Sequence, residues 1–148
     1  MKLLELAQKI ACGLDASKED IASVNDNLSG FEALIGLRYE VLSCDHVVAT
    51  LNVTEDHLQP WGVVHGGVHA AVAESVGSML SVLAMGGVVV GIENHTQFFH
   101  PATNGEIIYE AFPIHVGKTV QAIQIRAFDR RDPNRLISQT QLRTVARN

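Results

Sequence analysis

The stretch "WGVVHGGVHAAVAESVGSML", residues 61–80, decides the fold, because it holds most of the one long helical pattern in this 148-residue chain. Residues 66–85 are predicted to form that helix, and Gly86 and Gly87 are expected to end it. The pattern contains two anomalies. Gly66 and Gly67 stand where the helix begins, although glycine opposes helix formation. Glu74 interrupts an uncharged run, although a carboxylate opposes burial.

A helical wheel divides the segment into two faces at about 100° per residue. The large apolar side chains, which are expected to pack on a sheet, are Val68, Val72, Val76, Met79 and Leu83. The opposite face carries Glu74 among small residues, namely Gly67, Ala70, Gly77, Ser78 and Ser81. A glycine inside a helix costs about 1 kcal/mol relative to alanine. Gly77 therefore indicates a close approach, either by a second helix across a dimer or by a ligand, and both can hold together.

The start of the helix is predicted to bind a polarised oxygen. Helix N-termini leave backbone N–H groups unpaired and carry partial positive charge. Gly66 and Gly67 would allow a carbonyl or oxyanion to approach these groups closely. Glu74 has no Lys or Arg within four residues, which favours a functional carboxylate over an ion-paired surface one.

Composition excludes several classes of protein. A formal net charge of −5 argues against a general nucleic-acid or anionic-membrane partner. Cys12 and Cys44 form neither a disulfide framework nor a metal-binding pair. Glu5, Gln8 and Lys9 interrupt any signal-peptide core, and no run reaches the roughly 18 apolar residues of a membrane span. A soluble, cytoplasmic protein is therefore expected.

The remaining chain is predicted to form one amphipathic helix over residues 2–12, a polar stretch over 13–30 with room for one more helical turn, and several strands. Residues 34–53 are predicted to form a hairpin that turns near Ser43 to His46. Further strands are expected over 88–99, 106–117, 119–130 and 135–146, separated by "HPATNG", Gly117-Lys118 and "RDPN". This order indicates an α+β fold with an antiparallel sheet. We expect a helical extension over 1–33 before a single domain over 34–148.

The motif "GVVHGGVHAAVAES" resembles the helix start of hotdog-fold acyl-CoA thioesterases. It is most similar to the glutamate-type branch, which includes 4-hydroxybenzoyl-CoA and phenylacetyl-CoA thioesterase-like proteins. The resemblance spans about residues 35–146 in strand order as well as motif. It implies a long central helix wrapped by a curved antiparallel sheet. It also implies hydrolysis of an acyl-CoA or aroyl-CoA, with no cofactor beyond the CoA of the substrate.

The resemblance assigns a role to five positions around this motif. Gln59 would orient the thioester carbonyl, and His65 would support the loop geometry. The N–H of Gly66 would polarise the carbonyl. Glu74 would act as nucleophile or general base, and Ser78 would position water. In the family the equivalents of Gln59 and Gly66 come from one subunit, and those of Glu74 and Ser78 come from the other. The resemblance therefore implies a homodimer or a dimer-of-dimers tetramer.

The resemblance is weaker for contacts to the rest of the substrate. Related enzymes often carry a histidine after the strand "VGIENHTQFFHP", where this chain has Phe99 with His100 beside it and His95 further back. Trp61 is either a wall of the acyl pocket or an anchor of its loop. Gly67 is a further substrate-binding candidate.

The stretch "HVGKT", residues 115–119, matches the His-x-Gly-[Arg/Lys] context that contacts the CoA phosphates in the family. Lys118 is the candidate phosphate ligand, with His115 and Gly117 nearby. A solvated turn lysine is the alternative interpretation.

Three other functions compete with thioester hydrolysis. His65 and His69 have the i, i+4 spacing of zinc ligands, but His65 precedes the helix and His69 lies about 140° from Glu74, so no metal is expected. An enoyl-CoA hydratase would pair Asp or Glu with His on the helix in a different pattern. A non-catalytic acyl-CoA-binding module would not need Gln59, Glu74 and Ser78 together.

Overall fold

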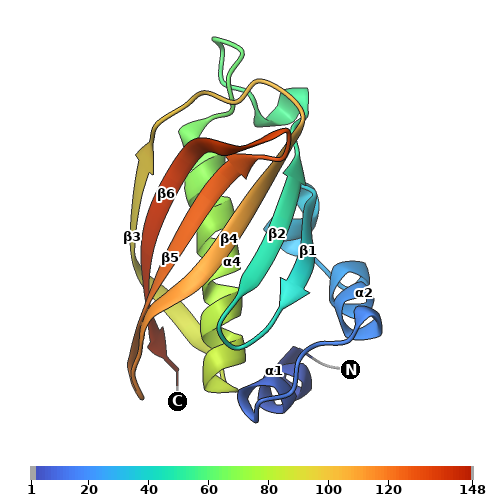
Figure 1. Cartoon of the computed structure of the whole chain (residues 1–148), viewed down its shortest axis with the longest axis vertical. Coiled ribbons are helices and arrows are strands. Elements are labelled where there is room, and N and C mark those ends of the chain that lie inside the picture. The colour runs from blue at the N-terminus through green and yellow to red at the C-terminus, as the bar shows by residue number, and fades with distance from the viewer. Residues whose placement is uncertain (1–2, 148) are drawn as a thin grey trace.

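The computed structural model describes residues 3–147 (Figure 1). Residues 1, 2 and 148, which belong to the helix and domain ranges expected from the sequence, lie outside this part. The helices are α1 (Leu3–Ala11), α2 (Lys18–Asp26), α3 (Gly30–Leu34) and α4 (Gly66–Met85), with a short 3-10 turn at Glu55–His57. The strands are β1 (Leu37–Leu42), β2 (Val47–Asn52), β3 (Val89–Phe98), β4 (Glu106–Val116), β5 (Val120–Asp129) and β6 (Asp132–Ala146).

The strands form one antiparallel sheet in the order β1-β2-β4-β5-β6-β3. The sheet curves around α4, which runs the length of its inner face (Figure 1). After α4 the chain crosses to the far edge as β3, and β4, β5 and β6 then fill the space between β3 and β2. This arrangement confirms the expected α+β hotdog architecture.

The core lies between α4 and the sheet. Val72, Val76, Leu80 and Leu83 of α4 are fully buried, and the sheet supplies apolar side chains opposite them, including Tyr109, Ile123, Ile125 and Leu142. Burial of each such aliphatic side chain contributes about 1.5–3 kcal/mol. By length and apolar composition α4 resembles a membrane span, but half of its most apolar window is buried inside the protein, as expected for the core helix of a sheet-wrapped fold.

Local signals fix both ends of α4 where the sequence predicted them. The ring Nδ1 of His65 accepts the N–H of Gly67 at 2.8 Å and so caps the first turn. At the other end Gly86 adopts a left-handed conformation with φ of 66°, and its N–H bonds the carbonyl of Val82. The hairpin over β1 and β2 also turns at Ser43 to His46, as expected.

The small-residue face of α4 is less uniform than the wheel predicts. Gly77 is buried against the sheet, where an added Cβ would lie 2.7 Å from Leu142 and 2.8 Å from Ile125. The expectation that Gly77 faces a ligand or a second helix is therefore wrong, because side chains of its own sheet require the glycine. Ser81 is also buried rather than on the open face.

Ser81 belongs to a buried polar network that joins α4 to β5 and β6. The Thr144 hydroxyl donates to the amide oxygen of Gln121 at 2.8 Å and lies 2.9 Å from the Ser81 hydroxyl. Thr144 has one proton, so Ser81 donates to it in return. The Gln121 amide nitrogen donates to the carbonyl of Gly117 at 2.9 Å. The network therefore links the middle of the core to the turn between β4 and β5.

Two local expectations are wrong. Residues 13–30 contain all of α2 rather than a single turn, because Ser17 and Asp20 form a capping box and Lys9 pairs with Asp20 at 2.7 Å. The last strand also begins earlier than residue 135. The chain turns at Arg130 and Arg131, and β6 begins at Asp132, within the "RDPN" stretch.

Candidate active site

The loop before α4 is held in place by backbone contacts. Leu58 and Val64 form an isolated bridge, and the N–H of His65 bonds the carbonyl of His57 at 2.9 Å. The buried ring of His57 in turn contacts the carbonyl of Ile35 through Nε2 at 2.9 Å. This loop fixes where the first residues of α4 point.

Gly66 presents an unused donor at the start of α4. Within residues 3–147 its N–H has no hydrogen-bond partner, whereas the N–H of Gly67 is bonded to His65. The two glycines therefore differ, although the sequence suggested the same role for both. An added Cβ on Gly66 would lie 2.8 Å from the ring of Phe98. The close approach that Gly66 permits is thus made by Phe98, and its N–H remains available at the positive end of the helix.

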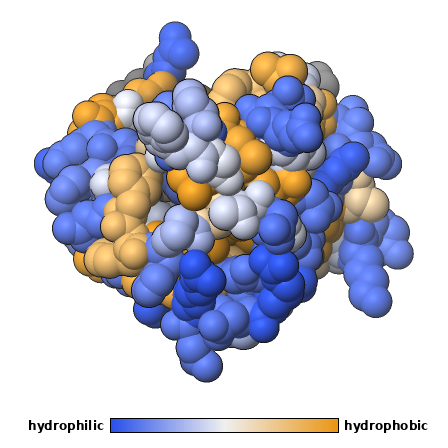
Figure 2. All heavy atoms as spheres, turned by 90° about the horizontal axis from the view of Figure 1, so that it is seen from above, coloured by the Kyte–Doolittle hydropathy of each residue, from blue (hydrophilic) through white to orange (hydrophobic). Residues whose placement is uncertain are grey.

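Gln59 and Trp61 lie on the same loop but differ in their surroundings. The side-chain oxygen of Gln59 accepts the N–H of Trp61 at 2.9 Å, which leaves the amide nitrogen as its outward donor. Trp61 is 87% exposed, so it does not anchor the loop within the described chain, and it lines neither of the two hollows beside Glu74. Figure 2 views this end of the molecule and shows apolar groups between hydrophilic ones. Phe98 and Phe99, at the end of β3, are each about half exposed.

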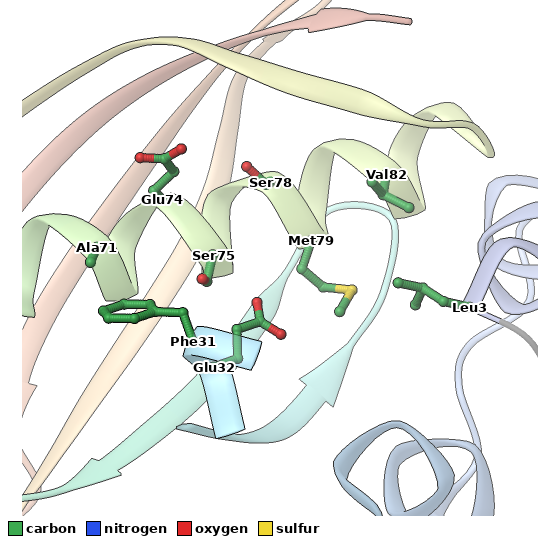
Figure 3. A pocket seen from close by; sticks show the side chains of 9 residues that line it. All are labelled: Leu3, Phe31, Glu32, Ala71, Glu74, Ser75, Ser78, Met79 and Val82. Atoms are coloured by element: carbon green, nitrogen blue, oxygen red, sulfur yellow. The ribbon is translucent and has the colours of Figure 1, made fainter. Parts of the chain in front are cut away.

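Glu74 lies on the open face of α4, with Ser78 one turn further along (Figure 3). In the part of the chain that is described, Glu74 makes no ion pair or hydrogen bond. Its carboxylate comes close to the backbone of β3, where an added Cβ on Gly91 would lie 3.2 Å from Oε1. Both Glu74 and Ser78 line a hollow of about 420 Å³, together with Ser75, which the sequence reasoning did not identify.

A second, smaller hollow of about 210 Å³ lies on the β3 side of Glu74. Its lining includes Gly91 and Asn94. The Asn94 amide donates to the carbonyl of Ala70 at 2.9 Å and so ties β3 to α4. Glu74 therefore stands between two hollows.

One chain does not bring all the predicted residues together. Gly66 and Glu74 are eight residues apart on one helix, which places them about 12 Å apart along its axis. A single carbonyl group about 3 Å from a donor cannot also meet a carboxylate at that distance. Gln59, His65 and Gly66 form one cluster in the chain, and Glu74 and Ser78 form another.

The strand after α4 brings further candidates near the first cluster. Phe99 and His100 follow β3, and both of their N–H groups bond the carbonyl of Ile137. The His100 Nδ1 contacts the carbonyl of Leu136 at 2.7 Å, so one ring nitrogen is already used. His95 is exposed within β3, where it pairs with Gln141 of β6.

His115, Gly117 and Lys118 lie at the opposite end of the molecule. His115 lies near the end of β4, and Gly117 and Lys118 lie in the turn between β4 and β5. This turn adjoins the end of β6, because the N–H of Ala146 bonds the carbonyl of Thr119, and Ala146 pairs with Val89 at the start of β3. An added Cβ on Gly117 would lie 2.8 Å from the His115 ring. Lys118 is exposed there. Within one chain this turn is therefore separated from Gly66 by the length of α4.

His69 and Tyr109 form a buried pair that the sequence gave no means to detect. The His69 Nδ1 lies 2.8 Å from the Tyr109 hydroxyl, and its ring lies 6.1 Å from that of Phe98. Burial lowers the pKa of His69 to about 4 and raises the pKa of Tyr109. His65 and His69 thus make separate contacts rather than sharing a ligand, and residues 3–147 contain no group of three potential metal ligands.

Comparisons with known proteins place this arrangement in a family. A model of the thioesterase superfamily matches residues 62–134. The chain is 33% identical to the 1,4-dihydroxy-2-naphthoyl-CoA hydrolase of Escherichia coli, over 80% of this chain and 85% of that protein. It is 34% identical to the proofreading thioesterase EntH of Klebsiella pneumoniae, over 66% of this chain and 72% of that protein.

A solved structure shares this fold. The crystal structure of AziG from S. sahachiroi superposes with a TM-score of 0.77 at 39% identity, and the match covers 81% of this chain and 98% of that one. Sequence, topology and the position of the motif at the start of α4 agree. The chain is a thioester hydrolase, and it belongs to the hotdog-fold thioesterase superfamily.

Proposed function

We propose that the protein hydrolyses an acyl-CoA or aroyl-CoA to the free acid and CoA, with Glu74 as the reacting carboxylate. The observation that carries this proposal is the position of Glu74. Its carboxylate lies on the open face of α4 between two hollows, with no ion pair or hydrogen bond among the described residues. A carboxylate without such a partner is free to act on a bound substrate.

Two routes use the same residues. As a general base, Glu74 takes a proton from water held by Ser78, and the water oxygen attacks the thioester carbonyl carbon. As a nucleophile, a Glu74 oxygen attacks that carbon and forms a mixed anhydride, which water then hydrolyses. In both routes the carbon–sulfur bond breaks, the CoA thiolate leaves and takes a proton, and the acid is released. No cofactor is needed beyond the CoA of the substrate.

The carbonyl oxygen would be held by a second subunit. Negative charge that develops on this oxygen is stabilised by the Gly66 N–H at the positive end of α4, with the Gln59 amide as a further donor. Because Gly66 and Glu74 of one chain lie about 12 Å apart, the donor that meets a carbonyl beside Glu74 comes from another copy. His65 contributes through its cap on Gly67.

The open edge of β3 is where such a dimer would form. Among residues 3–147, β3 pairs with β6 on one side only, and Val90 and Ile92 are exposed on it. An unpaired edge with exposed apolar side chains is a natural site for pairing with another strand. We therefore propose a homodimer, or a tetramer built from two such dimers, in which each site uses both subunits.

The CoA nucleotide would be bound by the turn between β4 and β5. Lys118 is exposed there, beside His115 and Gly117, and an ammonium group attracts phosphate. This turn lies far from Gly66 of its own chain, at the end of the molecule where α4 finishes. The relative named for a dihydroxynaphthoyl-CoA supports an aroyl group as one substrate class.

The proposal is tested by Glu74→Ala and Glu74→Gln against a panel of acyl-CoA and aroyl-CoA thioesters. Release of the CoA thiol by the wild type should fall by at least about a hundredfold in both variants, because the reacting carboxylate is gone. Binding of a slowly hydrolysed CoA ester should change little. The matched control is Glu19→Gln, which removes an exposed carboxylate from α2.

Three outcomes would contradict the proposal. The wild type could release no thiol from any member of the panel, as a binding module would. It could hydrate an enoyl-CoA instead. Finally, Glu74→Ala could retain wild-type turnover, which would exclude Glu74 as the reacting group even if hydrolysis itself occurs.

A further inference from the structure

The hollow beside Glu74 extends away from β3 to the N-terminal helices (Figure 3). On α4 its lining residues run from Ala71 to Val82 at intervals that place them on one face of the helix. The opposite wall comes from α3, which contributes Phe31 and Glu32, and from Leu3 of α1. The segment before β1 therefore supplies part of the candidate site.

Apolar side chains line this hollow along its length. Phe31 is 52% exposed and Leu3 is 43% exposed, although both line the hollow. Figure 3 shows Phe31 near Ala71 at the Glu74 end, and Leu3 near Met79 at the other end. Large apolar side chains that remain in contact with water gain stability when an apolar group covers them. A planar ring suits this place, because aromatic rings pack favourably against both phenylalanine and methionine.

Glu32 places a carboxylate among these apolar groups. Its Oε1 accepts a hydrogen bond from the Tyr39 hydroxyl at 3.3 Å. Tyr39 is buried, and burial together with the charge of Glu32 raises the pKa of Tyr39 well above its usual value. The phenol therefore stays protonated and remains a donor to Glu32. Tyr39 holds the carboxylate from inside the protein.

The second oxygen of Glu32 is left for a ligand. Among residues 3–147, Oε2 has no hydrogen-bond partner, and no Lys, Arg or His forms an ion pair with Glu32. Figure 3 shows the carboxylate directed toward α4, near Ser75 and Met79. An acceptor with a full negative charge thus borders a space with apolar walls.

We propose that Glu32 selects the acyl group, accepting a hydrogen bond from a hydroxyl on an aroyl ring that lies between Phe31 and Met79. The same carboxylate repels acyl groups that carry a carboxylate of their own. This inference rests on the proposed function, because it assigns the acyl part of the thioester to the hollow beside Glu74.

The electrostatics of the hollow favour this selectivity. Glu32 and Glu74 line the same space, so a third carboxylate there would face two like charges. A hydroxyl carries no charge and supplies the proton that Oε2 lacks. Loss of a hydrogen bond to a charged group should change the relative rate by roughly tenfold or more.

The experiment compares kcat/KM for benzoyl-CoA, each monohydroxybenzoyl-CoA isomer and 4-carboxybenzoyl-CoA. The proteins are the wild type, Glu32→Gln, Glu32→Ala and the control Glu19→Gln. The wild type should prefer at least one hydroxybenzoyl isomer over benzoyl-CoA and should disfavour the carboxybenzoyl ester. Glu32→Gln keeps the size and an acceptor oxygen but removes the charge. It should raise the carboxybenzoyl-to-benzoyl ratio by roughly tenfold or more, and Glu32→Ala should also abolish the hydroxyl preference.

The outcomes separate this inference from the proposed function. A wild type that hydrolyses none of the thioesters overturns both. A wild type that turns over thioesters but shows no preference for hydroxyl over carboxylate overturns the inference alone, and it does so even if a variant fails to fold. Unchanged ratios in both Glu32 variants overturn it as well. The Glu19→Gln ratios should equal those of the wild type.

Discussion

At the scale of single residues, His69 connects the core to the candidate site. It is 4% exposed, contacts the Tyr109 hydroxyl, and lies near Phe98, whose ring occupies the place of a Cβ on Gly66. Because burial lowers its pKa to about 4, the imidazole is neutral at neutral pH. A charged imidazole would have to be buried beside two aromatic rings, which is unfavourable.

This burial predicts a specific loss of stability in acid. Below pH 6.5 the unfolded chain protonates this histidine, whereas folded His69 stays neutral until about pH 4. The free energy of unfolding should therefore fall as pH drops through this window, by about 3 kcal/mol in total, and this contribution should level off below it. Urea unfolding of the wild type and His69→Asn at pH 7, 5.5 and 4 measures the effect.

Asparagine is the appropriate replacement because it can still bond Tyr109 but does not titrate in this range. The variant should lack the part of the pH dependence that His69 causes. Parallel stability curves for the two proteins would contradict the assignment. Asp20 and Asp129, whose hydrogen bonds to Lys9 and Arg131 lower their pKa to about 2, lose their contribution only at lower pH.

At the scale of elements, α4 shows which features can be predicted from the sequence. Its ends were predictable because His65 and Gly86 act within a turn of their own positions. The residues that pack against each face of α4 could not be predicted. Gly77 faces Leu142 and Ile125, which lie more than forty residues further along the chain and reach α4 only through the sheet. No local pattern contains that information.

Gly77→Ala separates helix propensity from packing. Alanine should gain about 1 kcal/mol in the helix, but its Cβ would press on Leu142 and Ile125 in a full core, which typically costs about 1–3 kcal/mol. We expect a net loss of about 1 kcal/mol, measured by urea denaturation. Adding Ile125→Val removes one of the two obstructing methyl groups and should make the double variant more stable than the sum of the single changes. Additive losses would show that the clash does not control the result.

The N-terminal helices α2 and α3 differ in how much of their structure and role the sequence predicts. The capping box that starts α2 is visible in the sequence as Ser17 and Asp20, and it could have predicted the helix. The part of α3 in the candidate site had no such signal. Phe31 and Glu32 matter because α3 packs across from α4, and their separation from Glu74 in sequence hides that relation.

At the scale of the whole molecule, the proposed site draws on two chains. The roles proposed for Gln59, Gly66, Glu74 and Ser78 come from the motif, and their separation into two clusters follows from helix geometry. The unpaired edge of β3 offers the surface on which two chains can join the clusters.

Dimers of two different variants test whether each active site uses residues from both subunits. Gln59→Ala and Glu74→Ala, each nearly inactive alone, should recover activity when co-expressed, because one site of a mixed dimer then contains both native residues. Random pairing at equal amounts should restore about a quarter of wild-type activity. Thiol release from the purified mixture is the measurement. No recovery, or a monomeric mass for the active wild type at micromolar concentration, would contradict a shared site.

The buried network of Ser81, Thr144 and Gln121 helps to specify the register between neighbouring strands. Apolar core side chains repack with modest cost when neighbouring strands slide. Buried hydroxyl and amide groups instead lose their hydrogen-bond partners when the strands slide. A one-residue slip of β6 along β5 would turn Thr144 to the other face of the sheet and strand its two partners without hydrogen bonds in the interior. The hydrogen bonds of this network therefore form only when β5 and β6 pair in their native register and α4 packs against them.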